Sequence, residues 1–456
     1  MNKRYILFAF SSQVFYNGIR RKSMKKLKAA LLGAGNRGQI YCDYALTCPE
    51  ELEIVSVIDI NPFKMNEAGD KYGIKKEMRF LSLDEFIKAN VECDFVVNAT
   101  MDEMHYETAM KLIEAGYNLV LEKPITGNLT ELLDIERAAR EKEVKILVCH
   151  VLRYTPFYRS IKQIIDSGKI GKVINMQLNE HVWYGHFVNS YVRGKWRSEK
   201  ACGSGLLLAK CCHDTDLICW LNNITEPKMV SSFGSKSFFT EKNAPKGATQ
   251  YCYECPNKEN CMFNAYKFQI EKDFIPFYTW ADLNKPLDEI TLDEKVEFLK
   301  KDVYGQCVYK TDMAIVDRQC VSIEFENGSI ATLNMIGGTS KAGRHIHVIC
   351  EYGEIVGYVE ESKIILRVFD QNDVKYTEEV IDCSKEYQRG DGDNSVAGHY
   401  GGDYFLMKDA VRYFNGISES VSVTKIEDSL NGHYVCYAAE ISRKERKMLS
   451  LDELKK

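Results

Sequence analysis

Apolar and polar residues in the first third of the chain form short apolar runs separated by longer amphipathic stretches. The apolar runs are typical of strands buried on both faces of a parallel sheet, and they lie at residues 27–32, 52–59, 93–100, 117–121 and 144–151. Helix-compatible stretches lie between them, at residues 39–47, 103–115 and 128–142. Strands that alternate with helices at this spacing predict a doubly wound parallel sheet, as in a Rossmann domain.

The pattern changes after residue 150, where apolar residues tend to recur at every second position, as in half-buried strands. Such segments lie at residues 172–183, 228–239, 320–325, 329–336, 344–350, 354–359 and 363–369. Glu326, Asn327 and Gly328 supply hairpin turn chemistry within this meander, and helical patterns at 403–414 and 425–445 follow it. We therefore predict a Rossmann domain at residues 24–150 and a larger α+β domain at 151–456.

A glycine-rich segment, Gly-Ala-Gly-Asn-Arg-Gly at residues 33–38, joins the first strand to the first helix. In this context the first glycine permits a tight turn, the second lets the backbone approach a pyrophosphate, and the third lets the helix pack on the strand. Asp59 closes the next strand, where a carboxylate can bind the adenosine ribose, and no arginine follows it, which favours NAD over NADP. The candidate cofactor residues here are Gly33, Gly35, Asn36, Arg37, Gly38 and Asp59.

Further motifs follow in a fixed order: Asn98-Ala99-Thr100, His105, Glu122-Lys123-Pro124 and the segment 150–154. In this order the chain resembles the Gfo/Idh/MocA family of oxidoreductases, the glucose-fructose oxidoreductase and inositol dehydrogenase group. The resemblance implies a C-terminal domain built on a large, mostly antiparallel sheet that covers the nicotinamide. It also implies that Lys123 touches the reacting hydroxyl, that Glu122 lies near the nicotinamide ribose, and that Thr100 and His105 belong to cofactor-side loops.

The segment 203–217 carries the remaining candidate catalytic groups. His213 and Asp216 match the family pattern, in which the histidine acts as acid or base and the acid helps to hold the substrate. Position 209 departs from that pattern, because it is Ala where dehydrogenases commonly carry Asp, and the neighbouring Lys210 is a candidate to enter the site instead. Histidine has the pKa range for proton transfer near neutrality. Asp216 either orients His213 or only packs the helix.

Aromatic and polar residues gather at 181–197, where aromatic faces can stack on sugars and arginines can hold hydroxyls or carboxylates. A plain aromatic loop that packs on the sheet is the alternative. The candidate substrate residues are Arg153, His181, Tyr184, Arg193, Trp196, Asp216 and, beside two glycines, His399.

Three cysteines, Cys252, Cys255 and Cys261, lie in a stretch with Pro245, Gly247 and Pro256 that is expected to form a long loop. Their spacing suits three thiolates of a structural zinc or iron–sulfur site. Cys307 is a candidate fourth ligand, and free thiols or a disulfide are the alternatives.

Composition narrows the class of protein. The formal net charge is −5, which supplies no basic surface for nucleic acid. No apolar run approaches the ~20 residues of a membrane span, and most of the 16 cysteines lie in apolar runs, as buried thiols of a cytoplasmic protein would. Residues 1–23 are expected to form a disordered extension, with a secretory signal as the weaker alternative because the apolar stretch is short.

Three functions fit these features. The first is an NAD-dependent dehydrogenase that removes hydride from a hydroxyl-bearing carbon of a sugar, polyol or sugar derivative. The second is a redox-neutral NAD-dependent glycosidase, in which transient oxidation of the sugar allows elimination. The third is a non-catalytic NAD-binding regulator, in which replacing Lys123 or His213 by alanine would change nothing. The family resemblance further implies a homodimer or homotetramer formed through the C-terminal sheets.

Overall fold

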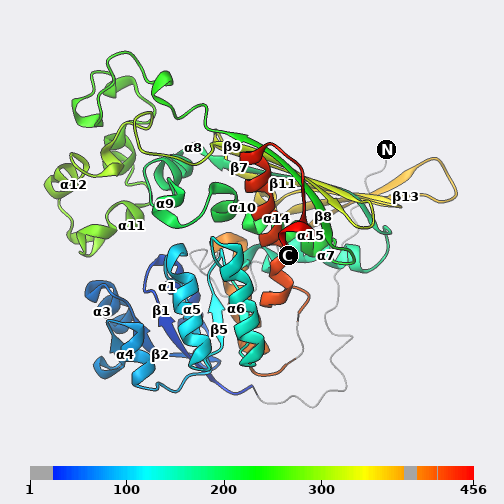
Figure 1. The fold of residues 1–456 in the computed structure, drawn as a ribbon, viewed down its shortest axis with the longest axis horizontal. Coiled ribbons are helices and arrows are strands. Elements are labelled where there is room, and N and C mark those ends of the chain that lie inside the picture. The colour runs from blue at the N-terminus through cyan, green and yellow to red at the C-terminus, as the bar shows by residue number, and fades with distance from the viewer. Residues whose placement is uncertain (1–23, 385–397, 418–419, 456) are drawn as a thin grey trace.

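A computed structural model describes residues 24–384, 398–417 and 420–455. The expected N-terminal extension, residues 1–23, lies outside the described residues. Two sheets organise the chain, one in each half, and they face each other across a layer of helices (Figure 1).

The first sheet is a parallel sheet of six strands in the order β3-β2-β1-β4-β5-β6, which confirms the predicted Rossmann sheet. Its strands are β1 (Leu27–Leu32), β2 (Leu52–Ile58), β3 (Arg79–Phe80), β4 (Phe95–Asn98), β5 (Leu119–Leu121) and β6 (Ile146–Val148). The strand order reverses between β1 and β4. In open α/β sheets a crevice for ligands forms at this switch point, outside the carboxyl ends of the strands.

Helices flank this sheet and bury its apolar side chains. They are α1 (Asn36–Cys42), α2 (Tyr44–Thr47), α3 (Pro62–Lys71), α4 (Leu83–Lys88), α5 (His105–Glu114) and α6 (Leu129–Glu141). The single helix expected at 39–47 is divided at Asp43, and each part is short. Amphipathic patterning explains α5 and α6, because their buried residues recur at helical spacing.

The second sheet has nine strands in the order β14-β13-β12-β11-β7-β10-β9-β8-β15. All its pairs are antiparallel except β7 with β10, so the expected large, mostly antiparallel sheet is confirmed. Its strands are β7 (Val173–Trp183), β8 (Pro227–Ser235), β9 (Arg318–Phe325), β10 (Ile330–Thr339), β11 (Gly343–Cys350), β12 (Gly353–Tyr358), β13 (Lys363–Phe369), β14 (Tyr376–Asp382) and β15 (Leu449–Ser450).

Helices cover one face of this sheet, and α10 is the most enclosed of them. Fifteen of its sixteen residues are buried, because it lies between the nine-stranded sheet and the Rossmann domain (Figure 1). The helices of this half are α7 (Pro156–Asp166), α8 (Tyr184–Phe187), α9 (Glu199–Cys202), α10 (Leu206–Leu221), α11 (Pro276–Thr279), α12 (Leu292–Leu299), α13 (Gly402–Phe414), α14 (Ile426–Glu445) and α15 (Leu451–Leu454).

Two parts of the chain depart from a simple division at residue 150. Helix α13 packs its buried face, including Leu406 and Met407, into the apolar core of the Rossmann domain. The chain between β8 and β9 forms a separate lobe of short helices around Trp280. Within the described residues, no helix has the length and apolar character needed to cross a membrane.

Candidate active site

A cleft opens at the carboxyl ends of the Rossmann strands, between the glycine-rich loop, helix α10 and the lobe. Its volume is about 1330 Å³, counted with its open mouth. It is lined by Gly35, Asn36, Arg37, Lys64, Ala99, Thr100, Met101, Asp102, Glu122, Lys123, His186, Ser190, Tyr191, Lys195, Trp196, Ala209, Lys210, His213, Phe277, Tyr278, Ala281, Tyr304, Arg344 and His399.

The glycine-rich loop has the geometry that a dinucleotide requires. Gly33 adopts a φ of +86°, and a Cβ there would lie 2.5 Å from the carbonyl oxygen of Ala99. A Cβ on Gly38 would lie 2.3 Å from the carbonyl oxygen of Gly33, so helix α1 needs glycine to pack this closely. Gly35 differs, since a Cβ there would meet nothing within 4 Å. That open space lets a pyrophosphate approach the backbone, so these residues fit NAD.

Asp59 follows β2 and faces the same loop. Its carboxylate accepts hydrogen bonds from the backbone amides of Ala34, at 2.7 Å, and Asn61, at 2.8 Å. These bonds hold the carboxylate beside the loop, where the ribose of a bound adenosine would lie. Asp59 is outside the cleft lining given above.

Arg37 is tied into a network at the cleft wall. Its Nε donates to Glu122 at 3.0 Å, and its Nη2 donates to Asp403 at 2.5 Å. His399 lies 3.1 Å from the same Asp403 carboxylate. Burial opposes charge on Arg37, but Asp403, Tyr41 and Glu122 outweigh it and raise its pKa. Arg37 therefore lines the cleft as part of a fixed ion-pair network, and His399 lines it through its contact with Asp403.

Lys123 lies two residues after the end of β5, and its ammonium group reaches across to α10. Its Nζ donates to the backbone carbonyl of Ala209 at 2.9 Å. Burial works to lower its pKa, but the acidic groups of Cys212, Glu122 and Asp102 outweigh burial and raise it. Lys123 is therefore protonated at neutral pH and can donate to an oxygen in the cleft.

His213 lies in the middle of α10 with a neutral imidazole. Burial, followed by the charge of Lys123 and by His150, holds its pKa well below the ordinary value of 6.5. Its ring packs edge-on to His150, with centroids 5.7 Å apart, and its buried Nδ1 has no hydrogen-bond partner among the described residues. A neutral imidazole beside a protonated lysine is a proton acceptor next to a proton donor.

Lys210 also lines the cleft, and it belongs to a buried cluster of charges. Its Nζ lies 3.4 Å from Glu180, and Arg344 lies 2.7 Å from Glu180 and 2.9 Å from Asp214. Arg344 and Glu180 are direct neighbours across β11 and β7. The cluster holds Arg344 at the cleft wall, where it is a further candidate for binding an oxygen-rich or anionic ligand.

Several aromatic side chains form the opposite wall. Trp196 lines the cleft, and its indole N–H donates to Asp102 at 3.3 Å. Tyr278 packs edge-on against Trp196, with ring centroids 5.8 Å apart, and Tyr191 lies beside it. Such a wall suits the C–H faces of a sugar. Trp196 and Tyr191 belong to the aromatic segment 181–197 that was singled out from the sequence, whereas Tyr278 does not.

Arg153 and Asp216, two expected substrate residues, lie away from the cleft lining. They pair with each other, with Arg153 Nε 2.7 Å and Nη2 2.5 Å from the Asp216 carboxylate, and both are buried. No bond to His213 is present among the described contacts of Asp216. The alternative in which Asp216 only packs the helix accords with this placement, because Asp216 also contacts Gly432 of α14.

His181, Tyr184 and Arg193 are also outside the cleft lining. His181 points to the open face of the sheet, since neighbouring Glu180 and Val182 are buried on the other face. Tyr184 packs on Phe263 and Phe268 of the lobe. The segment after β7 is helical there and does not form the open loop that was considered from the sequence. Arg193 turns into the lobe.

The remaining cofactor-side residues lie as the motif order suggests. Thr100 lines the cleft, and its hydroxyl donates to Asn98 at 3.0 Å. The ring of His105 lies between the carbonyl oxygens of Pro124, 2.7 Å away, and Thr100, 3.1 Å away. His105 is buried and joins the loops that follow β4 and β5 instead of lining the cleft.

Sequence reasoning missed Arg344, Glu180, Asp102 and Tyr278. The first two carry a readable signal, because each is in phase with the buried apolar residues of its strand. A charge on the inward face of a strand needs a partner or a ligand. Asp102 and Tyr278 sit in short helical turns with no periodic pattern.

Comparisons with known proteins identify the family and the fold. Residues 27–150 match the family described as "Oxidoreductase family, NAD-binding Rossmann fold", and residues 158–255 match the "GFO/IDH/MocA C-terminal domain". The YteT protein of Bacillus subtilis (strain 168), which is named as an oxidoreductase, is 22% identical over 371 residues, or 78% of this chain and 81% of its own length. The scyllo-inositol 2-dehydrogenase (NADP(+)) IolW of the same organism is 25% identical over 41% of this chain and 49% of its own length.

Solved structures share the whole fold. An NAD binding oxidoreductase from Klebsiella pneumoniae superposes with a TM-score of 0.68 at 17% identity, over 93% of this chain and 99% of its own. A levoglucosan dehydrogenase in complex with NADH and levoglucosan gives 0.67 at 17% identity, with the same coverage. Identities this low establish the common two-domain architecture and nothing finer.

Proposed function

Because the chain belongs to the Gfo/Idh/MocA oxidoreductase family, we propose that it transfers hydride between NAD and a hydroxyl-bearing carbon of a sugar-like substrate. The observation that carries this proposal is the pair formed by a protonated Lys123 and a neutral His213 in one cleft beside the glycine-rich loop. Inositol and levoglucosan dehydrogenases among the similar proteins support a sugar or polyol as substrate.

When bound, NAD supplies the hydride acceptor. In the proposed oxidation, the Lys123 ammonium donates a hydrogen bond to the substrate oxygen, which lowers the pKa of that hydroxyl. His213 accepts the hydroxyl proton while the neighbouring C–H bond gives up its hydride, so an alcohol becomes a ketone and one proton remains on His213. Arg37 and Asp403 keep Glu122 in place beside Lys123.

The alanine at position 209 leaves the binding of substrate oxygens to other side chains of the cleft, and Lys210 and Arg344 are candidates for that role. Alanine supplies no carboxylate at that position, and only its backbone carbonyl meets Lys123. Lys210, Arg344 and the neighbouring Lys195 place three cations in the lining of the cleft. We propose that these groups hold the oxygens of the substrate, and sugar acids belong in any substrate panel.

The test mixes the protein with NAD and separate sugars, polyols, sugar acids and glycosides, and follows NADH absorbance. Accumulation of NADH with one class is the expected result and names the substrate group. Cleavage of a glycoside without net NADH would contradict net oxidation and support the redox-neutral alternative. If the protein binds NAD but neither produces NADH nor cleaves a glycoside with any compound of the panel, the result would favour a non-catalytic NAD-binding regulator.

We also propose that the protein assembles as a homodimer or homotetramer through the nine-stranded sheet. The face of the sheet opposite the helices carries exposed apolar side chains, among them Phe233, Ile330, Tyr358 and Phe369. An exposed apolar sheet face is typical of an interaction surface. Light scattering tests this directly, and a monomer mass would refute it.

A further inference from the structure

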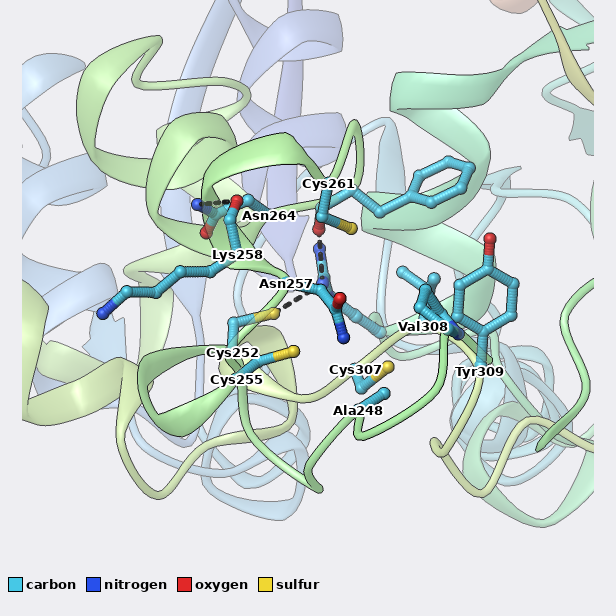
Figure 2. A pocket seen from close by; sticks show the side chains of 13 residues that line it. Ala248, Cys252, Cys255, Asn257, Lys258, Cys261, Asn264, Cys307, Val308 and Tyr309 are labelled. Carbon is cyan, nitrogen blue, oxygen red and sulfur yellow. Dashed lines mark hydrogen bonds between the residues drawn. The ribbon is translucent and has the colours of Figure 1, made fainter. Parts of the chain in front are cut away.

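Four cysteines line one small pocket in the lobe, three of them close together in the sequence and the fourth far from them. Cys252, Cys255 and Cys261 come from the stretch after β8, and Cys307 comes from the end of the lobe. Figure 2 shows the thiols of Cys252 and Cys255 on one side of this pocket and those of Cys261 and Cys307 on the other. The folded chain thus brings the candidate fourth ligand to the three that lie close together in sequence.

Each of these cysteines stands at the start of a tight backbone turn. The carbonyls of Cys252, Cys255, Cys261 and Cys307 accept hydrogen bonds from the amides three residues later, at 3.2, 3.2, 3.2 and 2.9 Å. The backbone amides of Phe263 and Tyr309, two residues after a cysteine, donate to the thiols of Cys261 and Cys307. Backbone N–H groups directed at sulfur are donors of the kind that support a metal-bound cysteine.

Arg193 supplies an independent observation, because its guanidinium is buried among these sulfurs. Its Nη2 lies 3.5 Å from the sulfur of Cys252 and donates to the carbonyl of Phe263 at 2.7 Å, while its Nε donates to the carbonyl of Gln306 at 2.8 Å. Among the described residues, its buried Nη1 has no hydrogen-bond partner. An unpaired buried charge costs several kcal/mol, so this cation calls for a negative charge in the pocket.

The lobe is built from short helices and turns. It contains helices of four to eight residues and a small apolar cluster built on Trp280, Ile290, Leu299 and Tyr304. The described strands of the nine-stranded sheet do not extend into it. Phe263 and Val308, which line the cysteine pocket, belong to the main core, and short irregular segments of this kind are often fixed further by a disulfide or a structural metal.

We propose that Cys252, Cys255, Cys261 and Cys307 bind one structural Zn²⁺. Four thiolates around Zn²⁺ form a tetrahedral centre with a net charge of −2, and the Cys252-x-x-Cys255 spacing is the usual first half of such a site. Arg193 then balances part of that charge and donates to sulfur. The described thiols do not yet converge closely enough to hold an ion, so zinc draws them together and releases protons on binding.

The proposed zinc centre would also fix the part of the lobe that lines the cleft. Arg193 is three residues from Trp196, and the lobe contributes Phe277, Tyr278 and Tyr304 to the cleft lining. A metal that fixes the lobe therefore fixes the aromatic wall of the proposed active site. Loss of zinc should raise KM for the substrate more than it lowers kcat, because the catalytic pair lies on the Rossmann domain and α10.

The first experiment measures zinc by inductively coupled plasma mass spectrometry in the full-length protein, purified without chelators or immobilised metal. One zinc per chain is expected, released when an organomercurial modifies the thiols. Protein that carries no zinc, iron with acid-labile sulfide in its place, or a disulfide among these cysteines would each overturn the proposal.

Substitutions of single cysteines then test which thiols bind the zinc ion. Cys307→Ser and Cys261→Ser should lose zinc, whereas the matched control Cys320→Ser, at an exposed thiol on β9, should keep it. Should the site variants fail to fold, cobalt substitution of the wild-type protein replaces them, and the visible absorption of tetrahedral cobalt–thiolate is expected. Absence of those bands would contradict a four-thiolate site. These readouts do not depend on the proposed hydride transfer, so either proposal can fail alone.

Discussion

Acidification should destabilise the protein through His433, a fully buried residue of α14. Its Nδ1 lies 3.0 Å from the carbonyl of Ser429, and its Nε2 accepts the backbone amide of Ile125 at 3.0 Å. Burial, with His150 beside it, lowers its pKa to about 3. Protonation of Nε2 would place its N–H opposite the N–H of Ile125, and two donors cannot hydrogen-bond to each other. The native state therefore favours the neutral ring.

The sign and size of the effect follow from proton binding. Unfolded His433 takes up a proton as the pH falls through ~6.5, whereas the native residue does so only near 3. As the pH is lowered, the unfolded state therefore binds a proton at a higher pH than the native state does, and the free energy of unfolding decreases. Between pH 7.5 and 5.5, this one residue should remove ~1.4 kcal/mol from the free energy of unfolding.

The assay compares wild type with His433→Gln in urea unfolding at pH 7.5, 6.5 and 5.5, followed by circular dichroism and tryptophan fluorescence. The variant is less stable at every pH, but its loss on acidification should be smaller than that of wild type by ~1.4 kcal/mol. Other groups titrate alike in both proteins, so they cancel in this difference. Parallel curves for wild type and His433→Gln would refute the reasoning.

The remaining predictions concern the cleft. Lys123→Met should lower kcat by about 10²–10⁴-fold with NAD affinity little changed, since the ammonium acts on the substrate oxygen; a loss confined to NAD binding would contradict its role. His213→Asn should lower kcat similarly, whereas His181→Asn should not. The depressed pKa of His213 should place the acidic limb of kcat/KM for oxidation below pH 6.5 in wild type, and a limb centred above 6.5 would argue against this base. Asp59→Ala should raise the NADP preference at least ~10-fold, measured as the ratio of kcat/KM for the two cofactors. Gly38→Val should abolish NAD binding or folding, because its Cβ would lie 2.3 Å from a carbonyl oxygen.

Local pattern was enough to predict many of the elements and the cofactor loop, although α3, α7 and β14 were not among the predicted segments. The apolar run at 27–32, the glycine-rich loop and Asp59 follow one another within one strand–helix–strand unit, so spacing alone relates them. Lys123 came from its motif, and His213 came from the family pattern. The strand alternation of 344–350 and 363–369 likewise appears in the structure as β11 and β13.

Pairings across long stretches of chain were decided by the tertiary structure. The sequence contains no signal that Arg153 meets Asp216, 63 positions away, so Arg153 was assigned to substrate. Arg193 was assigned likewise, although its guanidinium lies beside Cys252. Both arginines are buried, and a buried charge takes whichever partner the packing of distant elements supplies.

The range of the interactions explains why local elements could be predicted from the sequence and long-range pairings could not. Helix and strand periods, turns and glycine-rich loops are set by the backbone and by neighbours within a few residues, so the amino-acid sequence determined them directly. The parallel pairing of β7 with β10, the return of α13 to the Rossmann core and the meeting of four cysteines require chain closure over tens to hundreds of residues. Such contacts depend on the total free energy of the packed fold, and only the tertiary structure specified them.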